Sequence, residues 1–286
     1  MPSLVDIRRR IRSVRNTQQI TKAMKMVSAA KLRRAQGRAV ESRPYARMLE
    51  HILPHIVGIA AQTESPDFAP LLAAREEERI QLVVVSSDRG LAGAFNANLF
   101  RMAHRFIDEH SSAAIRVEAI GKKARDYFRR RNFTLTGEHI GIVEKPSYEK
   151  AAEIARKLVE TFRKAEVDAV YVAGNEFKTV MAPNLVLRKL LPVKLPEGGD
   201  PVAFIEEQDP ERMLRLLLPR YVEMEIYRAM LESNSAEHAA RMTAMDTATS
   251  NANDVIDSLT LNLNRARQAN ITREIIEIVG GAAALG

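Results

Sequence analysis

The chain contains no cysteine and no tryptophan, and only 5% of its 286 residues are aromatic. Without cysteine it has no disulfides, no thiolate metal site and no cysteine nucleophile. This composition fits a reducing compartment. Hydrophobic residues make up 46% of the chain, which is enough for a real core in one or two domains.

Long apolar runs are also missing. No segment approaches the roughly 20 apolar residues that a bilayer-spanning helix needs. The N-terminal MPSLVDIRRRIRSVRNTQQ has neither an apolar core segment nor a cleavage site, so it does not read as a secretory signal. It is Arg-rich and acid-poor, as transit peptides are. Because the same amphipathic pattern runs well past the length of a transit peptide, we interpret it as mature structure.

Positive charge is concentrated at one end of the chain. Residues 1–50 carry thirteen Lys or Arg against three Asp or Glu, whereas the whole chain has a formal net charge of only +7. This imbalance predicts an acidic partner for the N-terminal segment, which could be nucleic acid, an anionic membrane or an acidic protein surface.

The N-terminal segment has a helical pattern from about Ser3 to about His55. Ser3 followed by Asp6 is similar to a capping box. Apolar residues then recur at helical spacing, and Pro44 is expected to kink the helix. The apolar positions on which this reading depends are Ile7, Ile11, Val14, Ile20, Met24 and Val27.

A second helical pattern runs from about Asp209 to about Val279 and contains a heptad repeat. A sustained alternation of three-residue and four-residue spacings between the core positions of a helix requires a helical partner along its length. The other long helix of the chain supplies one, so we predict an intramolecular antiparallel coiled coil. An ordinary helical bundle is the alternative. The repeat consists of Met242, Met245, Thr249, Ala252, Ile256, Leu259, Leu263 and Ala266.

Between the two helices, strands and helices alternate, which predicts a central Rossmann-like α/β domain with a mostly parallel sheet. The expected strands are Ile80–Val85, Ile115–Ile120 and Val167–Val172. One expected helix follows Gly93 and runs to about His110. The other two span Lys122–Arg131 and Tyr148–Ala165. The expected organisation is an N-terminal shaft helix (1–57), a linker (58–79), the α/β domain (80–205) and a C-terminal shaft helix (206–286).

The turn Ser86–Asn96 is the best candidate for a phosphate cradle, because Gly90 and Gly93 lie between a strand and a helix. It lacks both the dinucleotide fingerprint and the P-loop pattern with its lysine. A structural turn is therefore the favoured interpretation, and we expect no bound nucleotide.

Histidine chemistry is equally sparse. His51 and His55 are four apart with Pro54 between them, and no third metal ligand is evident. His238 lies on the C-terminal seam and is interpreted as a packing residue. No Ser–His–Asp or paired-carboxylate arrangement can be argued from spacing. We expect no catalytic site, no cofactor and no metal.

The basic N-terminal face leaves nucleic-acid binding as the main alternative function. Tyr45 is the only aromatic residue in the first fifty, so base stacking has little to work with. An enzyme that uses the α/β domain is a weaker alternative, because that domain lacks a recognisable site.

Several long motifs resemble one family, the gamma subunits of F-type ATP synthases. The segment ITKAMKMVSAAKL at Ile20–Leu32 is similar to the N-terminal helix of that family. SNSAEHAARMT at Ser233–Thr243 and NRARQANITREIIEIVGGAAAL at Asn264–Leu285 resemble its C-terminal helix. SSDRGLAGAFN and GNEFKTVM are similar to its α/β domain. The resemblance covers essentially the whole chain in the right order.

The resemblance implies a non-catalytic rotor subunit that couples ion flow to ATP synthesis. The coiled coil would turn as a shaft inside a ring of alternating alpha and beta subunits, and the α/β domain would form a foot on the epsilon subunit and the c-ring. The beta subunits would then be the acidic partner. The positions that match the family's beta contacts are Met24, Arg241, Arg267, Gln268, Thr272 and Glu274.

The register that the family implies would bring Met24 beside Arg241, and the apolar end Ile275–Leu285 into an upper bearing of the ring. The chain departs from the family at Ala92, where many relatives have Cys. The paired-Cys insertion of the chloroplast form is absent. With no presequence before Met1, the resemblance favours a bacterial peripheral membrane protein on the cytoplasmic face, with no nucleic-acid or direct nucleotide binding.

Overall fold

A computed structural model describes residues 3–60, 70–177, 183–194 and 209–283 of the chain. The chain forms two compact units, one of residues 1–28 with 242–286 and one of residues 29–241. The two long helices each contribute to both units. The helices are α1 (Leu4–Ala60), α2 (Phe95–Glu109), α3 (Lys122–Arg129), α4 (Tyr148–Arg163) and α5 (Pro210–Ala283), and the strands are β1 (Arg79–Val85), β2 (Ala114–Ile120), β3 (Leu135–His139), β4 (Ala169–Phe177) and β5 (Pro183–Leu191).

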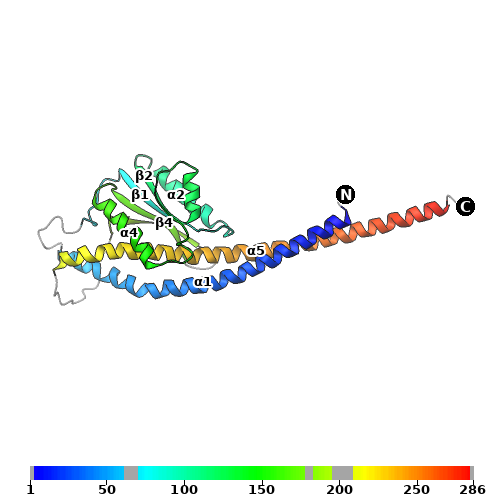
Figure 1. The fold of residues 1–286 in the computed structure, drawn as a ribbon, viewed down its shortest axis with the longest axis horizontal. Helices are drawn as coiled ribbons and strands as arrows, with labels where there is room; N and C mark the ends of the chain where they lie inside the picture. The colour runs from blue at the N-terminus through cyan, green and yellow to red at the C-terminus, as the bar shows by residue number, and fades with distance from the viewer. Residues whose placement is uncertain (1–2, 61–69, 178–182, 195–208, 284–286) are drawn as a thin grey trace. The chain divides into compact units, whose positions relative to one another are not determined.

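The larger unit is built on a five-stranded sheet in the order β3-β2-β1-β4-β5. Figure 1 labels three of these strands, β1, β2 and β4. β1 pairs in parallel with β2 and with β4, and β2 pairs in parallel with β3. β5 is antiparallel to β4 and occupies one edge. The predicted α/β domain with a mostly parallel sheet is therefore confirmed. β3 and β5 were not expected from the sequence.

Side chains alternate along each strand, so each face of the sheet has its own set of side chains. Different helices pack on the two faces. On one face, Ile80, Leu82 and Val84 of β1 pack with buried residues of α2 and α3. On the other face, Val83 and Val85 pack with α4, α1 and α5. The predicted strand β1 is buried on both faces, as its continuous apolar run indicates.

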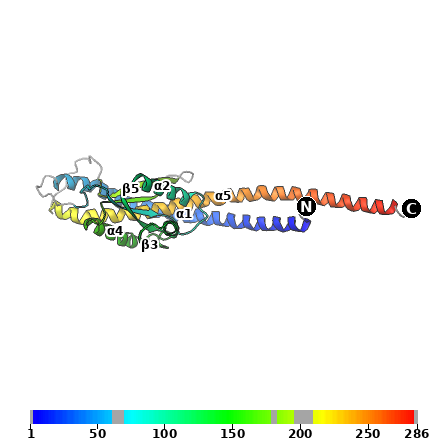
Figure 2. The ribbon, with the colours of Figure 1, turned by 90° about the horizontal axis from the view of Figure 1, so that it is seen from above.

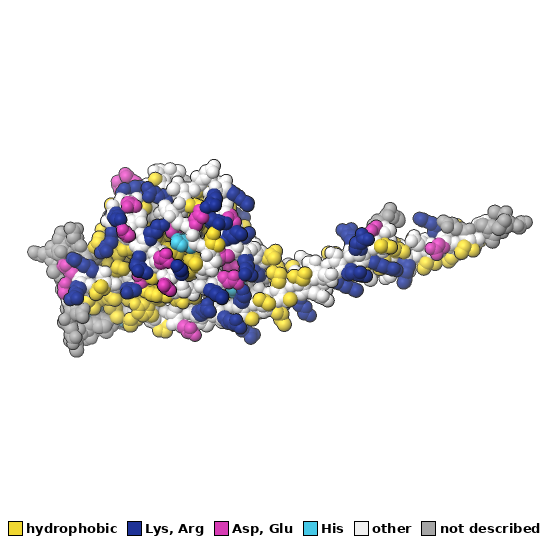
Figure 3. All heavy atoms as spheres, viewed as in Figure 1, with side chains coloured by type: hydrophobic (Ala, Val, Ile, Leu, Met, Phe, Trp, Pro, Cys, Tyr) yellow, Lys and Arg dark blue, Asp and Glu magenta, His cyan; other side chains and the backbone are white. Residues whose placement is uncertain are grey.

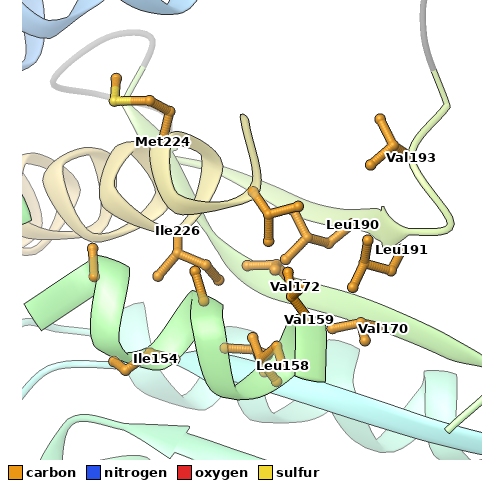
Figure 4. Packing of buried hydrophobic residues seen from close by; sticks show 14 of the residues in the cluster. Ile154, Leu158, Val159, Val170, Val172, Leu190, Leu191, Val193, Met224 and Ile226 are labelled. Atoms are coloured by element: carbon orange, nitrogen blue, oxygen red, sulfur yellow. The ribbon is translucent and has the colours of Figure 1, made fainter. Parts of the chain in front are cut away.

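The second of these two cores joins the long helices to the sheet. Figure 4 shows Ile154 and Leu158 of α4 close to Val172 of β4 and Ile226 of α5. In the same unit, the α5 side chain of Arg228 donates to Glu50 of α1 at 3.1 Å. Parts of α1 and α5 therefore belong to the core of the α/β unit, and their remaining residues form the other unit.

The smaller unit is a pair of helices. Thr21 of α1 hydrogen-bonds Thr249 of α5 at 2.8 Å, and Lys25 pairs with Asp246 at 2.5 Å. Because α1 numbers rise as α5 numbers fall, the helices are antiparallel, as Figures 1 and 2 show. The predicted antiparallel coiled coil is confirmed.

Local sequence explains where α1 begins. The Ser3 hydroxyl accepts from the Asp6 backbone N–H at 3.2 Å and donates to the Asp6 carboxylate at 2.8 Å, which is the predicted cap. α1 continues through Pro44 and Pro54 to Ala60, and α5 continues through Pro219. No helix in the described part of the chain is both long and apolar enough to cross a membrane.

Candidate functional site

The sheet has a switch point between β1 and β4. The chain leaves β1 for α2 on one face and reaches β4 from α4 on the other. In doubly wound folds, the crevice at the carboxyl ends of such strands is where ligands bind. Here α5 crosses that edge: the Ser233 hydroxyl donates to the Val85 carbonyl at 3.1 Å, at the very end of β1. The Asn234 amide donates to the Val143 carbonyl at 2.7 Å. The crevice is thus occupied by the chain itself.

The turn after β1 is tied by its own side chains. Asp88 accepts from the backbone N–H of Lys122 at 2.9 Å and of Gly141 at 3.0 Å. Ser87 and Asn96 bond each other across the turn at 2.8 Å. These bonds join the turn to the loops that follow β2 and β3. The geometry supports the interpretation of this segment as a structural turn.

The seam of the two-helix unit follows the heptad read from α5. Met245 and Ala252 are buried, while Ile256, Leu259 and Leu263 are partly buried. On α1 the buried positions are Ile7, Ile11, Thr21 and Ser28. Small and polar side chains therefore form much of the inner face of α1 in this unit.

Apolar residues of α1 face outward in the same unit. Ile20 is 60% exposed and Val27 is 56% exposed. The sequence pattern had included both among the apolar residues that recur at helical spacing. They lie one position before the buried Thr21 and Ser28, so they fall on another side of the helix. Their apolar side chains are thus available to a partner on this side of α1.

Positive charge lies over the first turns of α1. Arg8, Arg9, Arg10, Arg12 and Arg15 are all exposed. Among the ion pairs found in the described residues, none involves any of these five arginines. Figure 3 shows dark-blue side chains gathered over this part of α1. The unit therefore presents a cationic surface that suits an acidic partner.

The predicted contact residues have different environments. Met24 is half-buried on α1. Four others are exposed on one stretch of α5: Arg267, Gln268, Thr272 and Glu274. Arg241 is only 8% exposed, and its guanidinium is bonded within the chain. Met24 and Arg241 belong to different units, and their proximity stays a prediction.

The histidines lie in different environments. Within the described residues, no group of three potential ligands could hold a metal ion. His51 is exposed on α1, while His238 is buried. Burial first, and then the nearby charges of Arg241 and Lys31, lower the pKa of His238 to about 4. At neutral pH this imidazole is uncharged, which suits a packing residue.

A cavity of about 350 Å³ lies between the β4–β5 strands and α5 in the α/β unit. Its apolar wall includes Val172, Val186 and Leu190. Its charged groups engage one another: Arg228 contacts Glu50 at 3.1 Å and Glu232 at 3.0 Å. The arrangement is a set of ion pairs within α5 and between α5 and α1.

Comparison with known proteins gives one consistent result. The family model described as ATP synthase matches residues 3–285. The chain is 60% identical over 284 residues to the ATP synthase gamma chain of Solibacter usitatus, covering 99% of each chain. It is 50% identical over 290 residues to the ATP synthase gamma chain of Anaeromyxobacter sp. strain Fw109-5, covering 100% of each.

Solved structures with the same fold agree. A chain of the Euglena gracilis mitochondrial ATP synthase superposes with a TM-score of 0.68 at 19% identity, covering 99% of this chain and 94% of that one. A chain of the Tetrahymena thermophila mitochondrial ATP synthase central stalk and c-ring gives 0.61 at 24% identity, covering 80% and 99%. At these identities the likeness concerns the fold.

Proposed function

Because the chain belongs to the ATP synthase gamma chain family, we propose that it is the central-stalk rotor of a bacterial ATP synthase, which couples ion flow through the c-ring to ATP synthesis. The observation that carries this proposal is the 60% identity to a gamma chain along practically the whole of both sequences. The antiparallel helix pair and the α/β unit are the parts that such a rotor needs.

The partners we propose are the ring of alpha and beta subunits, the epsilon subunit and the c-ring. Two features of the two-helix unit support a surrounding protein partner. The outward aliphatic side chains of Ile20 and Val27 offer apolar area, and the exposed arginines in the first turns of α1 offer positive charge. Apolar contact without strong directionality suits a surface that must slide past its partner.

We propose that Met24, Arg267, Gln268, Thr272 and Glu274 contact the beta subunits. The last four support this role by their exposure along one part of α5. Arg241 remains a predicted beta contact. Its burial gives it little free surface and favours a role inside the chain, which is argued below.

The chain acts, in this proposal, without a catalytic site of its own and without binding nucleotide. The support is the switch-point crevice, which α5 fills through Ser233 and Asn234. The proposed location is the cytoplasmic face of the cell membrane, held there by partners of the membrane-associated complex. The sequence relatives give no support to the nucleic-acid-binding alternative.

Co-expression with the other subunits tests the proposal. Affinity purification of the tagged chain is expected to recover alpha, beta and epsilon subunits and the c-ring, with ATPase activity. Calorimetry of the chain alone is expected to detect no ATP binding. Recovery of nucleic acid in place of these subunits would contradict the assignment.

A paired set of variants tests the surface. Replacing both Ile20 and Val27 with Asp is expected to leave the helical content unchanged and to reduce ATP synthesis strongly, because two charges would enter an apolar contact. Replacing both Val40 and Met48 with Asp is the matched control, since these residues are 55% and 48% exposed on α1 but belong to the α/β unit. Equal effects of the two changes would count against this surface.

A further inference from the structure

One stretch of α5 is buried although it is mostly polar. Across Ser233–Arg241, eight of nine consecutive residues are buried, and among them are Glu237, His238 and Arg241. Charged side chains are rarely buried unless they are paired. A helix buried on all sides is expected to be apolar all round. The polar composition of this segment therefore calls for an explanation beyond core packing.

The polar side chains of this segment bond to the carboxyl edge of the sheet. Ser233 donates to the Val85 carbonyl at the end of β1, and Asn234 donates to the Val143 carbonyl in the loop after β3. Each bond joins a side chain of α5 to a main-chain oxygen of the α/β domain. Because main-chain carbonyl groups move less than side chains, these hydrogen bonds fix the rotation of α5 about its own axis relative to the sheet.

Arg241 makes the one charge-assisted connection among these three side chains. Its Nε and Nη2 atoms both donate to the Gly90 carbonyl, at 3.3 and 3.1 Å. The same guanidinium donates to the Glu237 carboxylate one turn earlier on α5. Glu237 neutralises and orients Arg241, and the planar fork of arginine can serve both partners at once.

The acceptor of Arg241 belongs to a strained turn. Gly90 precedes Leu91, whose backbone has φ of 61°, in the left-handed region that a leucine rarely adopts. Such a conformation persists only where neighbouring groups hold it. The peptide between Gly90 and Leu91 is the one that Arg241 grips, so the two features support each other.

Arg241 also occupies a particular place along the chain. It is the last residue of the α/β unit on α5, and Met242 begins the part of the helix that belongs to the two-helix unit. Any torque carried by α5 from the α/β domain must pass through this turn of helix. The contacts of Arg241 therefore lie at the point where α5 leaves the α/β unit, and torque carried by α5 to Met242 and beyond passes through this residue.

We propose that Arg241, oriented by Glu237 and assisted by Ser233 and Asn234, is a positioning residue that locks α5 to the α/β domain against twisting, so that rotation of this domain is passed along α5 without slack. The inference rests on the rotor function. It assigns to the buried polar segment a mechanical task, and to Arg241 a partner inside its own chain at Gly90.

The test uses Arg241→Gln and Arg241→Lys in the assembled complex, with two readouts. Amide hydrogen exchange of residues 87–93 is expected to rise roughly fivefold or more in Arg241→Gln, the factor for a lost hydrogen bond. Proton pumping per ATP hydrolysed is expected to fall about twofold or more. Arg241→Lys keeps the charge but lacks the planar guanidinium. Both its amide exchange and its pumping per ATP are expected to lie between those of Arg241→Gln and those of the parent.

Arg215→Gln is the matched control. Arg215 lies on α5 and pairs with Glu211 four residues earlier, as Arg241 pairs with Glu237, but its side chain is exposed. It is expected to change neither readout. Unchanged exchange at residues 87–93 in Arg241→Gln would overturn the lock. Faster exchange with full pumping per ATP would overturn its role in coupling while leaving the rotor assignment intact. Failure of the parent complex to couple pumping to hydrolysis would instead count against the rotor assignment.

Discussion

Thr21 of α1 and Thr249 of α5 share a hydrogen bond of 2.8 Å within the two-helix unit. The neighbouring pairs on either side are also polar: Gln18 with Asn253, and Lys25 with Asp246. Polar contacts on a coiled-coil seam fix the register at some cost in stability. The setting of α5 against α1 in this unit is therefore specified by hydrogen bonds as well as by apolar packing.

The losses of stability from replacing Thr21 and Thr249 are expected not to add: the double change costs less than the two single changes together. Thr21→Val leaves the Thr249 hydroxyl without its partner across the seam and is expected to cost about 1 kcal/mol. The double change Thr21→Val with Thr249→Val removes both hydroxyls from the buried seam and is expected to cost less than the sum of the single changes. Thermal unfolding followed by helical circular dichroism measures all three variants, and strict additivity would contradict the pairing.

Glu118 of β2 predicts a pH dependence of the α/β unit. Its carboxylate is 1% exposed and accepts from His139 at 2.7 Å and from Thr136 at 2.6 Å, with Lys157 at 3.6 Å. Burial, the largest influence, would raise the pKa of Glu118. The hydrogen bonds from His139 and Thr136 and the charge of Lys157 outweigh it and hold the pKa below its usual value of 4.5.

A carboxyl group whose pKa is lowered by folding stabilises the protein above its unfolded pKa, and this contribution is lost as the pH falls through the folded pKa. Glu118→Gln is therefore expected to cost about 2–3 kcal/mol at pH 7 and less below about pH 4. Glu138→Gln is the control, since Glu138 forms a more exposed pair with Arg129 and is expected to cost under about 1 kcal/mol. A penalty for Glu118→Gln that grows on acidification would reverse the predicted sign.

Gly121 joins β2 to α3 in a conformation that only glycine accommodates here. Its φ is 99°, and a Cβ at this position would lie 2.4 Å from the Ser86 carbonyl oxygen. Gly121→Ala is expected to cost about 3 kcal/mol or more, from backbone strain and from the clash together. Gly141→Ala, with φ of 77° but open space around it, is the control and is expected to cost about 1 kcal/mol. Chemical unfolding of the two variants compares strain alone with strain plus clash.

The sequence predicted the strands in which most residues are buried, because such strands are apolar along their length. β1 and β4 have apolar runs because both of their faces are covered. β2 is buried only from Val117 to Ile120 and has Glu118 within that part, so its apolar signal is weaker. β3, with the sequence LTGEH, was missed because it is half-exposed and contains Gly137 and the polar residues Glu138 and His139. β5 was missed because it begins with Pro183 and includes Arg188 and Lys189 within it. Edge strands need less apolar character, so their local signal is weak.

The candidate surfaces were only partly predictable. The heptad of α5 is legible because Met245, Ala252 and Ile256 repeat regularly. The inner face of α1 is not, because it continues from Ile11 into the polar residues Thr21 and Ser28, while Ile20 and Val27 turn outward. Which side of a helix is covered depends on its partner, and one sequence does not specify that. The burial of Ser233–Arg241 was hidden for the same reason.

Removing the C-terminal end is expected to affect assembly and leave the chain itself intact. Ile275, Ile276 and Val279 are exposed on α5 in the isolated chain, so their loss removes little internal packing. Deletion of residues 275–286 is expected to leave the unfolding midpoint unchanged, to weaken the assembled complex, and to leave measurable hydrolysis and rotation. Normal assembly with rotation abolished would show that the end carries torque.

Direct observation of rotation tests the rotor assignment most sharply. The chain has no cysteine, so Arg105→Cys on α2, where the side chain is 82% exposed, would give it a single thiol for a probe. In a complex immobilised through its beta subunits, the probe is expected to turn in one direction while ATP is hydrolysed. Sustained hydrolysis with a probe that stays fixed would contradict the assignment.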